Sequence, residues 1–135
     1  MLGDLVRAAY EHYVERIGVE PAPMHADYAA LVEQGLVWVA ADDAAVLGLV
    51  VLLPQRDHLL LDNIAVGPSA QGRGIGRTLL EFADNQAREL GYAEVRLYTN
   101  EHMTENLAFY PRHGYVETER AIVDGYGRVF LTKHL

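Results

Sequence analysis

The sequence predicts one α/β (α+β) domain with a mixed, mostly antiparallel sheet flanked by helices. Two observations lead to this fold class: the chain has 135 residues, of which 50% are hydrophobic, and its helical and strand-like patterns alternate irregularly. A chain of this length holds one hydrophobic core, since domains most often contain about 100 to 150 residues. The irregular order fits neither a regular βαβ alternation nor segregated layers. We therefore assign residues 1–135 to a single domain.

The N-terminal part is predicted to be helical. Apolar residues recur at three- and four-residue spacing over residues 1–17, which predicts an amphipathic helix that ends near Gly18. Two prolines predict a loop over residues 19–23, because proline lacks a backbone donor and restricts the residue before it. A second, short helix is expected over residues 25–34, with Gly35 as its C-terminal stop.

Strand patterns fill the middle of the chain. Residues 36–41 and 44–53 flank a pair of aspartates and predict a hairpin. Residues 58–66 are too continuously apolar for an exposed edge, which predicts a central strand. Residues 74–90 then carry the clearest helical pattern in the chain.

A second strand and a short helix follow the long helix. Residues 94–99 alternate between polar and apolar, which predicts a strand, and a short helix is expected to begin near Thr104. Pro111 predicts that this helix ends or kinks at Tyr110. The strand, helix and strand over residues 58–99 predict a parallel pair with a right-handed crossover.

The C-terminus is predicted to be a hairpin. Residues 115–123 and 126–131 flank the dipeptide Asp124-Gly125. This dipeptide suits a tight turn in which both central residues adopt positive φ.

Composition excludes several classes of function. The formal charge of -8, from 19 acidic and 11 basic residues, argues against binding to nucleic acid or to an anionic membrane surface. No apolar run approaches the roughly 18 to 20 residues of a membrane span, and no targeting segment is seen, so a cytoplasmic location is expected. Cysteine is absent and the six histidines are dispersed, so neither a cysteine nucleophile nor a metal site is expected.

A glycine-rich turn between the central strand and the long helix predicts an anion site. Glycines let the backbone approach a ligand closely, and the helix N-terminus offers N–H donors. Two arginines and no acid fall between positions 63 and 80, although the whole chain is acidic. The turn consists of Gln71, Gly72, Arg73, Gly74, Ile75, Gly76 and Arg77.

Three phosphate-binding patterns compete for this turn. A Walker A loop requires glycine at position 71 and lysine at position 77, where Gln71 and Arg77 stand. A dinucleotide fingerprint requires glycine at position 77 and a parallel doubly wound sheet. The pattern Gln/Arg-x-x-Gly-x-Gly/Ala matches at Gln71, Gly74 and Gly76.

The chain resembles the GNAT superfamily of acyl-CoA-dependent N-acyltransferases over roughly residues 36–131. Three blocks carry the resemblance: Asn-Ile-Ala-Val-Gly-Pro at 63–68, the glycine turn, and Asn-Leu-Ala-Phe-Tyr-Pro-Arg-His-Gly-Tyr at 106–115. The resemblance implies acetyl-CoA as co-substrate, inserted where the central strand splays from its parallel neighbour. The strand that usually begins this fold is apparently absent, and an unpaired sheet edge makes a homodimer possible.

The resemblance also assigns roles around the co-substrate. The backbone of Ala65 and Val66 would hold the pantetheine arm, the N–H groups of residues 72–77 would hold the pyrophosphate, and Val66 N–H would stabilise an oxyanion. Asn106 and Tyr110 share a helix face, so Asn106 can position the cofactor while Tyr110 protonates the departing thiolate.

The general base and the acceptor pocket are less clearly marked. Asp62 lies two strand steps before Val66 and shares the face of Ile64 if no bulge intervenes, so it could take the amine proton; Glu101 is a second candidate. By resemblance the first helices and the final hairpin wall the acceptor pocket, and an acidic chain suits a cationic amine. The wall candidates are Tyr10, Tyr13, Arg16, Asp27, Tyr28 and Tyr126. Of these, Tyr13, Tyr28 and Tyr126 could instead be packing residues.

These observations predict an N-acetyltransferase that moves an acetyl group from acetyl-CoA to a primary amine of a small molecule or peptide by direct attack. An alternative is a non-catalytic acyl-CoA-binding or regulatory module on the same scaffold. A nucleotide-phosphate hydrolase is disfavoured because the lysine of a Walker A loop is missing.

Overall fold

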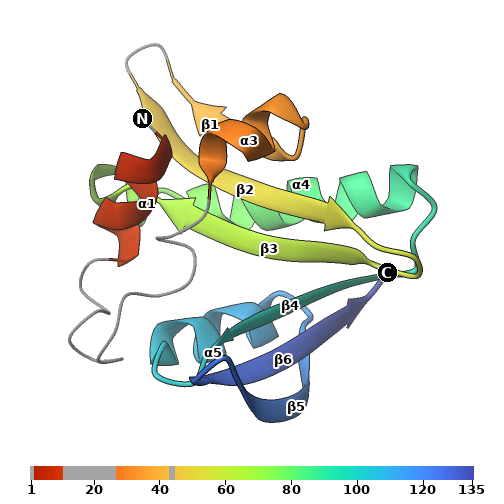
Figure 1. Ribbon diagram of the computed structural model, residues 1–135. Helices are drawn as coiled ribbons and strands as arrows, with labels where there is room; N and C mark the ends of the chain where they lie inside the picture. Colours follow the sequence, from red (N-terminus) through yellow and green to blue (C-terminus); the bar gives the residue numbers. More distant parts are fainter. Residues whose placement is uncertain (1, 11–26, 43–44) are drawn as a thin grey trace.

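A computed structural model describes residues 2–10, 27–42 and 45–135 of the chain (Figure 1). The described helices are α1 (Leu2–Tyr10), α3 (Tyr28–Glu33), the short 3-10 helix η3 (Pro68–Ala70), α4 (Ile75–Glu89) and α5 (Thr104–Arg112). The described strands are β1 (Val37–Ala41), β2 (Val46–Pro54), β3 (Leu59–Val66), β4 (Glu94–Asn100), β5 (Val116–Val123) and β6 (Tyr126–His134).

The six strands form one sheet in the order β1-β2-β3-β4-β6-β5. Only β3 and β4 run parallel, and α4 connects them; every other neighbouring pair is antiparallel. The predicted mixed sheet, the central position of β3 and the parallel pair are therefore confirmed. In the described chain α1 precedes β1 and no strand comes before it.

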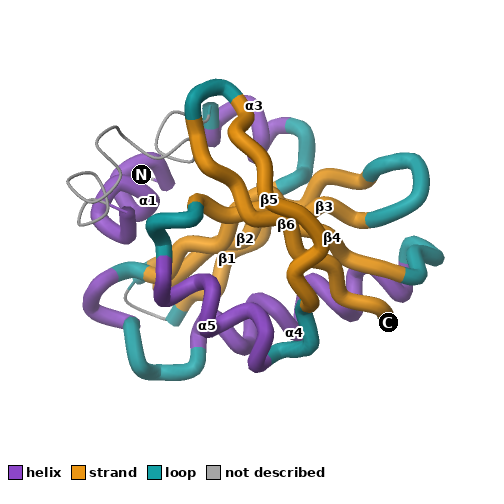
Figure 2. The backbone as a smooth tube through the Cα atoms, turned by 90° about the horizontal axis from the view of Figure 1, so that it is seen from below, coloured by secondary structure: helices purple, strands orange, loops and turns teal. Residues whose placement is uncertain are grey.

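Helices cover both faces of the sheet (Figure 2). On one face α4 and α5 enclose the larger apolar cluster, whose fully buried members include Val50, Leu80 and Val95. On the other face α1 and α3 cover a smaller cluster around Val6 and Leu49. The apolar residues of α4 recur at helical spacing because they form one stripe, and this stripe packs on the sheet.

Two turns form as their glycines predict. Gly74, with φ of 78°, ends the glycine turn in a left-handed conformation and begins α4. The hairpin turn between β5 and β6 has positive φ at both Asp124 (52°) and Gly125 (82°), as a two-residue turn of this kind requires. The predicted C-terminal hairpin is confirmed, with β6 extending to His134.

Several predicted boundaries differ from the structure. The helix predicted over residues 1–17 is described as α1 over residues 2–10, and residues 11–26, with the predicted loop, lie outside the described part. The second helix begins at Tyr28, because the Asp27 side chain caps it by accepting a hydrogen bond from Ala30 N at 3.1 Å.

The predicted end of the helix at Tyr110 is wrong. Helix α5 continues through Pro111 to Arg112, so the proline lies in the last turn. There it removes a single helical donor, and the chain closes with His113 N donating to Tyr110 O at 2.9 Å.

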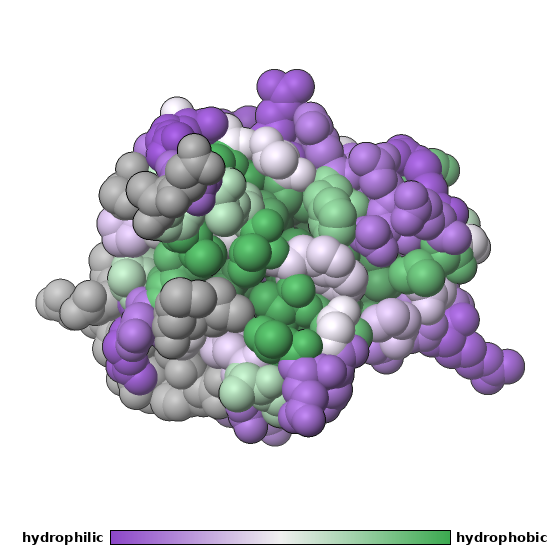
Figure 3. Space-filling model, turned by 90° about the horizontal axis from the view of Figure 1, so that it is seen from above, coloured by the Kyte–Doolittle hydropathy of each residue, from purple (hydrophilic) through white to green (hydrophobic). Residues whose placement is uncertain are grey.

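Seen from above, apolar side chains gather in the middle of the face, with polar side chains towards its edges (Figure 3). None of the described helices has the length and apolar character needed to cross a membrane.

Candidate active site

The parallel strands β3 and β4 pair only at one end. Leu59 pairs with Val95 and Leu60 with Arg96, and no further pair joins the two strands. From there β3 and β4 diverge towards the glycine turn and α5 (Figure 1). The divergence leaves the facing edges of both strands available to a ligand.

A bulge in β3 changes which side chains face the opening. Val51 of β2 pairs with Asn63, but Leu52 pairs with Leu61, so Asp62 is an extra residue in β3. Leu61 and Ile64 consequently both pack on the α4 side of the sheet. The condition on which Asp62 was expected to share the face of Ile64 is therefore not met.

Backbone direction distinguishes Val66 from Ala65. Gly67 N donates to Leu47 O of β2 at 2.8 Å, and hydrogen-bonding directions alternate along a strand. The N–H of Val66 therefore points away from β2, towards the opening. The backbone of Ala65 points towards β2 instead, where it pairs with Leu49, and its side chain is buried against α1. Ala65 is thus not placed as the resemblance implied.

A cavity of about 610 Å³ occupies the opening on the α4 and α5 side. It brings together the end of β3, the glycine turn and one face of α5, three segments that the sequence analysis singled out separately. Arg73 and Ala65 are not among its walls. The lining residues are Ile64, Val66, Ala70, Gln71, Gly72, Gly74, Ile75, Gly76, Arg77, Glu105, Asn106, Phe109 and Tyr110.

The glycine turn presents backbone donors to this cavity. Thr78 is the first residue of α4 whose N–H bonds within the helix, to Gly74 O at 3.1 Å, and no side chain caps the N-terminus. The preceding N–H groups of Ile75, Gly76 and Arg77 therefore lie where an anion would be stabilised. A Cβ at Gly72 or Gly74 would meet no atom within 4 Å, whereas one at Gly76 would approach Phe109 Cζ at 3.2 Å.

Tyr110 and Asn106 line the cavity from α5. Tyr110 is 5% exposed, and its ring packs edge-on against Phe109 and Tyr115 at 5.3 and 5.7 Å between centroids. Asn106 Nδ2 donates to Thr99 Oγ1 of β4 at 3.1 Å. Asn106 therefore anchors α5 to β4, while its side-chain oxygen remains an acceptor.

The opposite side of the opening carries the candidate acceptor residues. Asn63 Nδ2 donates to Tyr28 Oη at 2.9 Å, which holds α3 over the bulge. Burial raises the pKa of the Asp62 carboxyl, and the positive charge of Arg128 opposes this shift. Burial also raises the pKa of Tyr28 and of Tyr98, and in both cases the Asp62 charge adds to the shift. The Asp62 charge therefore acts on Tyr28, Tyr98 and Arg128, and Asp62 is not among the walls of the cavity.

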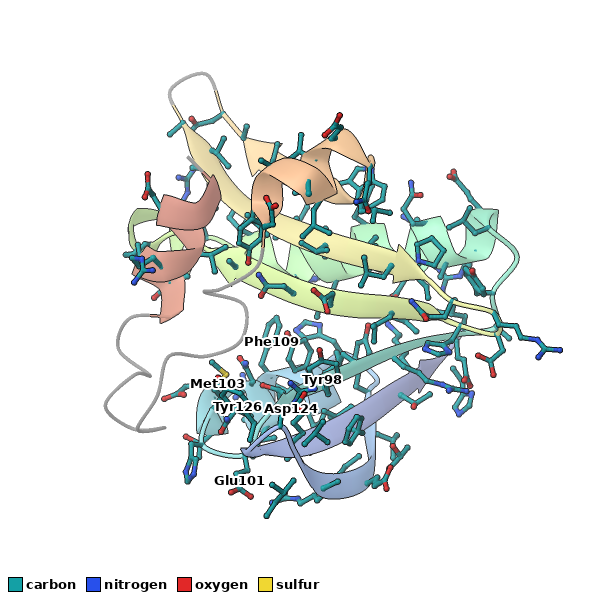
Figure 4. All side chains as sticks on the ribbon, viewed as in Figure 1. Tyr98, Glu101, Met103, Phe109, Asp124 and Tyr126 are labelled. Carbon is teal, nitrogen blue, oxygen red and sulfur yellow. The ribbon has the colours of Figure 1, made fainter. Side chains whose placement is uncertain are left out.

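The remaining candidates for the general base and the acceptor pocket lie in several parts of the chain. Figure 4 labels Tyr98, Tyr126 and Asp124 between β3 and the final hairpin, with Glu101 below them, on the side of the hairpin away from β3. Glu101 N donates to Gly127 O at 2.8 Å, and the Glu101 carboxylate packs against the Gly127 backbone. Asp27 serves as the cap of α3. Tyr13 and Arg16 lie outside the described residues, as does the side chain of Tyr10.

Sequence reasoning missed residues on both sides of the opening. Phe109 and Glu105 line the cavity because they flank Asn106 and Tyr110 on α5, so helical periodicity was the available signal. Tyr98 and Arg128 reach the other side from β4 and β6. Nothing in the sequence shows that these two strands are neighbours, since 30 positions separate Tyr98 from Arg128.

Comparison with known proteins identifies the family. The domain family described as "Acetyltransferase (GNAT) domain" matches residues 33–117. The chain belongs to the GNAT acetyltransferase family. The prediction of an acyltransferase domain is thus confirmed at the level of the family. The splayed strands β3 and β4 and the glycine turn form the candidate site of this domain.

Individual relatives agree with this assignment. A mycothiol acetyltransferase of Jonesia denitrificans is 34% identical over 88 residues, which cover 65% of this chain and 24% of the relative. The chain spans less than half the length of the curated relatives it matches.

Solved structures extend the likeness to the whole fold. An IAA acetyltransferase from Bacillus cereus has a TM-score of 0.73 at 25% identity, covering 100% of this chain and 93% of that one. A GNAT family acetyltransferase from Elizabethkingia anophelis with acetyl-CoA bound has a TM-score of 0.66 at 25% identity, covering 78% of this chain and 82% of that one.

Proposed function

We propose that this protein transfers an acetyl group from acetyl-CoA to a primary amine of a small molecule or peptide by direct attack. The main support is that β3 and β4 pair at only two positions and then diverge. The divergence leaves a cavity between Val66, the glycine turn and Tyr110. The likeness to an acetyltransferase with acetyl-CoA bound supports the choice of co-substrate.

The residues around the cavity fit this co-substrate. The uncapped N–H groups at the start of α4 suit a pyrophosphate, and the open space beside Gly72 and Gly74 lets it approach the backbone. The outward N–H of Val66 suits an extended amide chain or a carbonyl oxygen. Acetyl-CoA supplies the acetyl group as a reactive thioester.

Two side chains on opposite sides of the opening fit the proton transfers. Asp62 takes a proton from the attacking amine, directly or through water, and its raised pKa makes it a better base than an exposed aspartate. Tyr110, inside the cavity, gives a proton to the departing thiolate sulfur. The amine therefore approaches from the Asp62 side and the thiol leaves on the Tyr110 side.

Ligand preference is the first test. A thermal-shift comparison of acetyl-CoA, ATP and NAD is expected to give stabilisation by acetyl-CoA, because a ligand that binds only the folded state raises the melting temperature. Stabilisation by ATP or NAD without acetyl-CoA would contradict the proposal.

Turnover separates catalysis from simple binding. Thiol release is measured with a panel of primary amines for the wild type and Tyr110→Phe. We expect release with at least one amine and a large loss in the variant. Binding of acetyl-CoA without release on any amine would instead favour a non-catalytic acyl-CoA-binding module.

A further inference from the structure

Arg128 of β6 pairs with Asn100 of β4, near the candidate acceptor residues. Within the described part of the chain, no carboxylate lies within 4.0 Å of its guanidinium. Its neighbours are aromatic instead: the guanidinium carbon lies 4.3 Å from the centroid of the Tyr98 ring and 5.8 Å from that of Tyr126.

The aromatic neighbours fix the position of this guanidinium. A cation–π contact holds the guanidinium over the Tyr98 ring, and that ring packs against Phe130 at 5.8 Å between centroids. A guanidinium carries five N–H donors, so those that do not bond the Tyr98 hydroxyl remain for an acceptor with two oxygens. The main chain holds the strand in place, since Arg128 pairs with Asn100 of β4.

Arg128 shares this side of the opening with Asp62. Leu60 pairs with Arg96, so Asp62 lies two residues beyond that pair in β3, as Tyr98 does in β4. The Arg128 charge opposes the burial that raises the pKa of Asp62. The charges of Asp62 and Asp124 raise the pKa of Tyr98, whereas the charge and a hydrogen bond of Arg128 lower it. One positive and one negative group thus flank the point from which an amine would approach. Such a pair complements a zwitterion: the carboxylate of Asp62 faces the amine, and the guanidinium faces an anionic group on the same molecule.

We propose that Arg128 binds a carboxylate of the acceptor, so that the acceptor is a small molecule with both an amine and a carboxylate, as in an amino acid. This inference rests on the proposed acetyl transfer and narrows its substrate class. A peptide N-terminus without a nearby carboxylate, or a simple cationic amine, would leave the Arg128 guanidinium without a carboxylate partner.

Matched acceptors test the proposal. Each of the 20 common amino acids is compared with its amide and its decarboxylated amine in a thiol-release assay. The wild type is expected to prefer the carboxylate form of its acceptor. Arg128→Gln is expected to raise KM for that form by about 10- to 100-fold, the usual worth of a charge-assisted bidentate contact, while KM for acetyl-CoA stays unchanged.

Two further variants serve as controls. Arg128→Lys keeps the positive charge but loses the paired N–H donors that bind both oxygens of a carboxylate, so we expect an intermediate KM. Arg88→Gln removes an exposed arginine of α4 whose one hydrogen bond to a described residue is to Asn85, at 3.3 Å, and is expected to leave both KM values unchanged. Equal use of carboxylate and amide forms by the wild type would overturn the inference while leaving acetyl transfer intact.

Calorimetry decides the case in which no acceptor turns over. Binding of N-acetyl amino acids and their amides is measured in the presence of CoA, for the wild type and Arg128→Gln. Carboxylate-dependent binding that the variant loses would support the inference even though the proposed reaction had failed. Its absence would overturn the inference.

Discussion

Leu61 and Ile64 lie on the same face of β3, although residues three apart in an alternating strand face opposite ways. The bulge at Asp62 between them accounts for this, and it turns Asp62 towards the acceptor side while Ile64 faces the cavity. A single extra residue thus separates the candidate base from the candidate co-substrate site. Two side chains that act on opposite sides of a reacting carbon need such a separation.

Asp62→Asn is expected to lower kcat/KM by about 100-fold, a typical contribution of a general base. The wild-type pH profile should show an acidic limb above the usual aspartate range, because burial raises the pKa of Asp62, and the variant should lose that limb. Asp57→Asn, at an exposed carboxyl whose pKa is lowered mainly by the His58 hydrogen bond, is the control and should keep it. An unchanged limb in Asp62→Asn would exclude Asp62 as the base.

Asp62→Asn should lower activity but raise the free energy of unfolding at neutral and higher pH. A raised pKa means that the folded state binds the proton more readily than the unfolded state. Stability from this group is therefore present at low pH and is lost as pH rises through the folded pKa. Urea unfolding of Asp62→Asn at pH 8 should give a higher midpoint than the wild type, and the difference should shrink at pH 4.

Tyr110→Phe is expected to reduce kcat by about 100-fold or more, since it removes a positioned general acid, with little change in acetyl-CoA affinity. Tyr115→Phe is the matched control. Its hydroxyl is buried and has no hydrogen-bond partner in the described structure, so removing it should leave kcat unchanged. Similar losses in both variants would indicate a packing role for Tyr110.

Gly74→Ala should weaken acetyl-CoA binding at least tenfold, measured by calorimetry. The alanine would be strained at φ of 78° and would place a methyl group in the open space beside the helix N-terminus. Gly35→Ala is matched in conformation, with φ of 73° and equally open surroundings, but it follows α3. Both variants should be destabilised by about 1 kcal/mol, and only Gly74→Ala should lose affinity.

Lys133→Met should destabilise the fold by about 3 kcal/mol, because it leaves the buried Asp84 carboxylate without its partner. Lys133 Nζ lies 2.6 Å from Asp84 Oδ2, and the other Asp84 oxygen has no hydrogen bond in the described structure. Arg120→Met breaks the exposed pair with Glu117 and should leave the urea midpoint unchanged. Equal midpoints in both variants would contradict this account.

Local patterns made much of the site predictable. The glycine turn and its role as a helix start follow from residues close in the sequence, since positive φ and a free helix N-terminus are local properties. The shared face of Asn106 and Tyr110 follows from helical spacing alone. The helix end predicted at Tyr110 was wrong because a proline in the last helical turn removes only one bond.

The sequence by itself determined the order of the elements, the glycine turn, the hairpin turn and the family resemblance, because each depends on neighbouring residues. Only the tertiary structure decided where β3 and β4 stop pairing, that Asp62 forms a bulge against β2, and that Arg128 stacks on Tyr98. Pairing register and strand order are set by contacts between distant segments, which a one-dimensional pattern does not record. The side of the sheet on which Asp62 acts therefore depends on its partner strand.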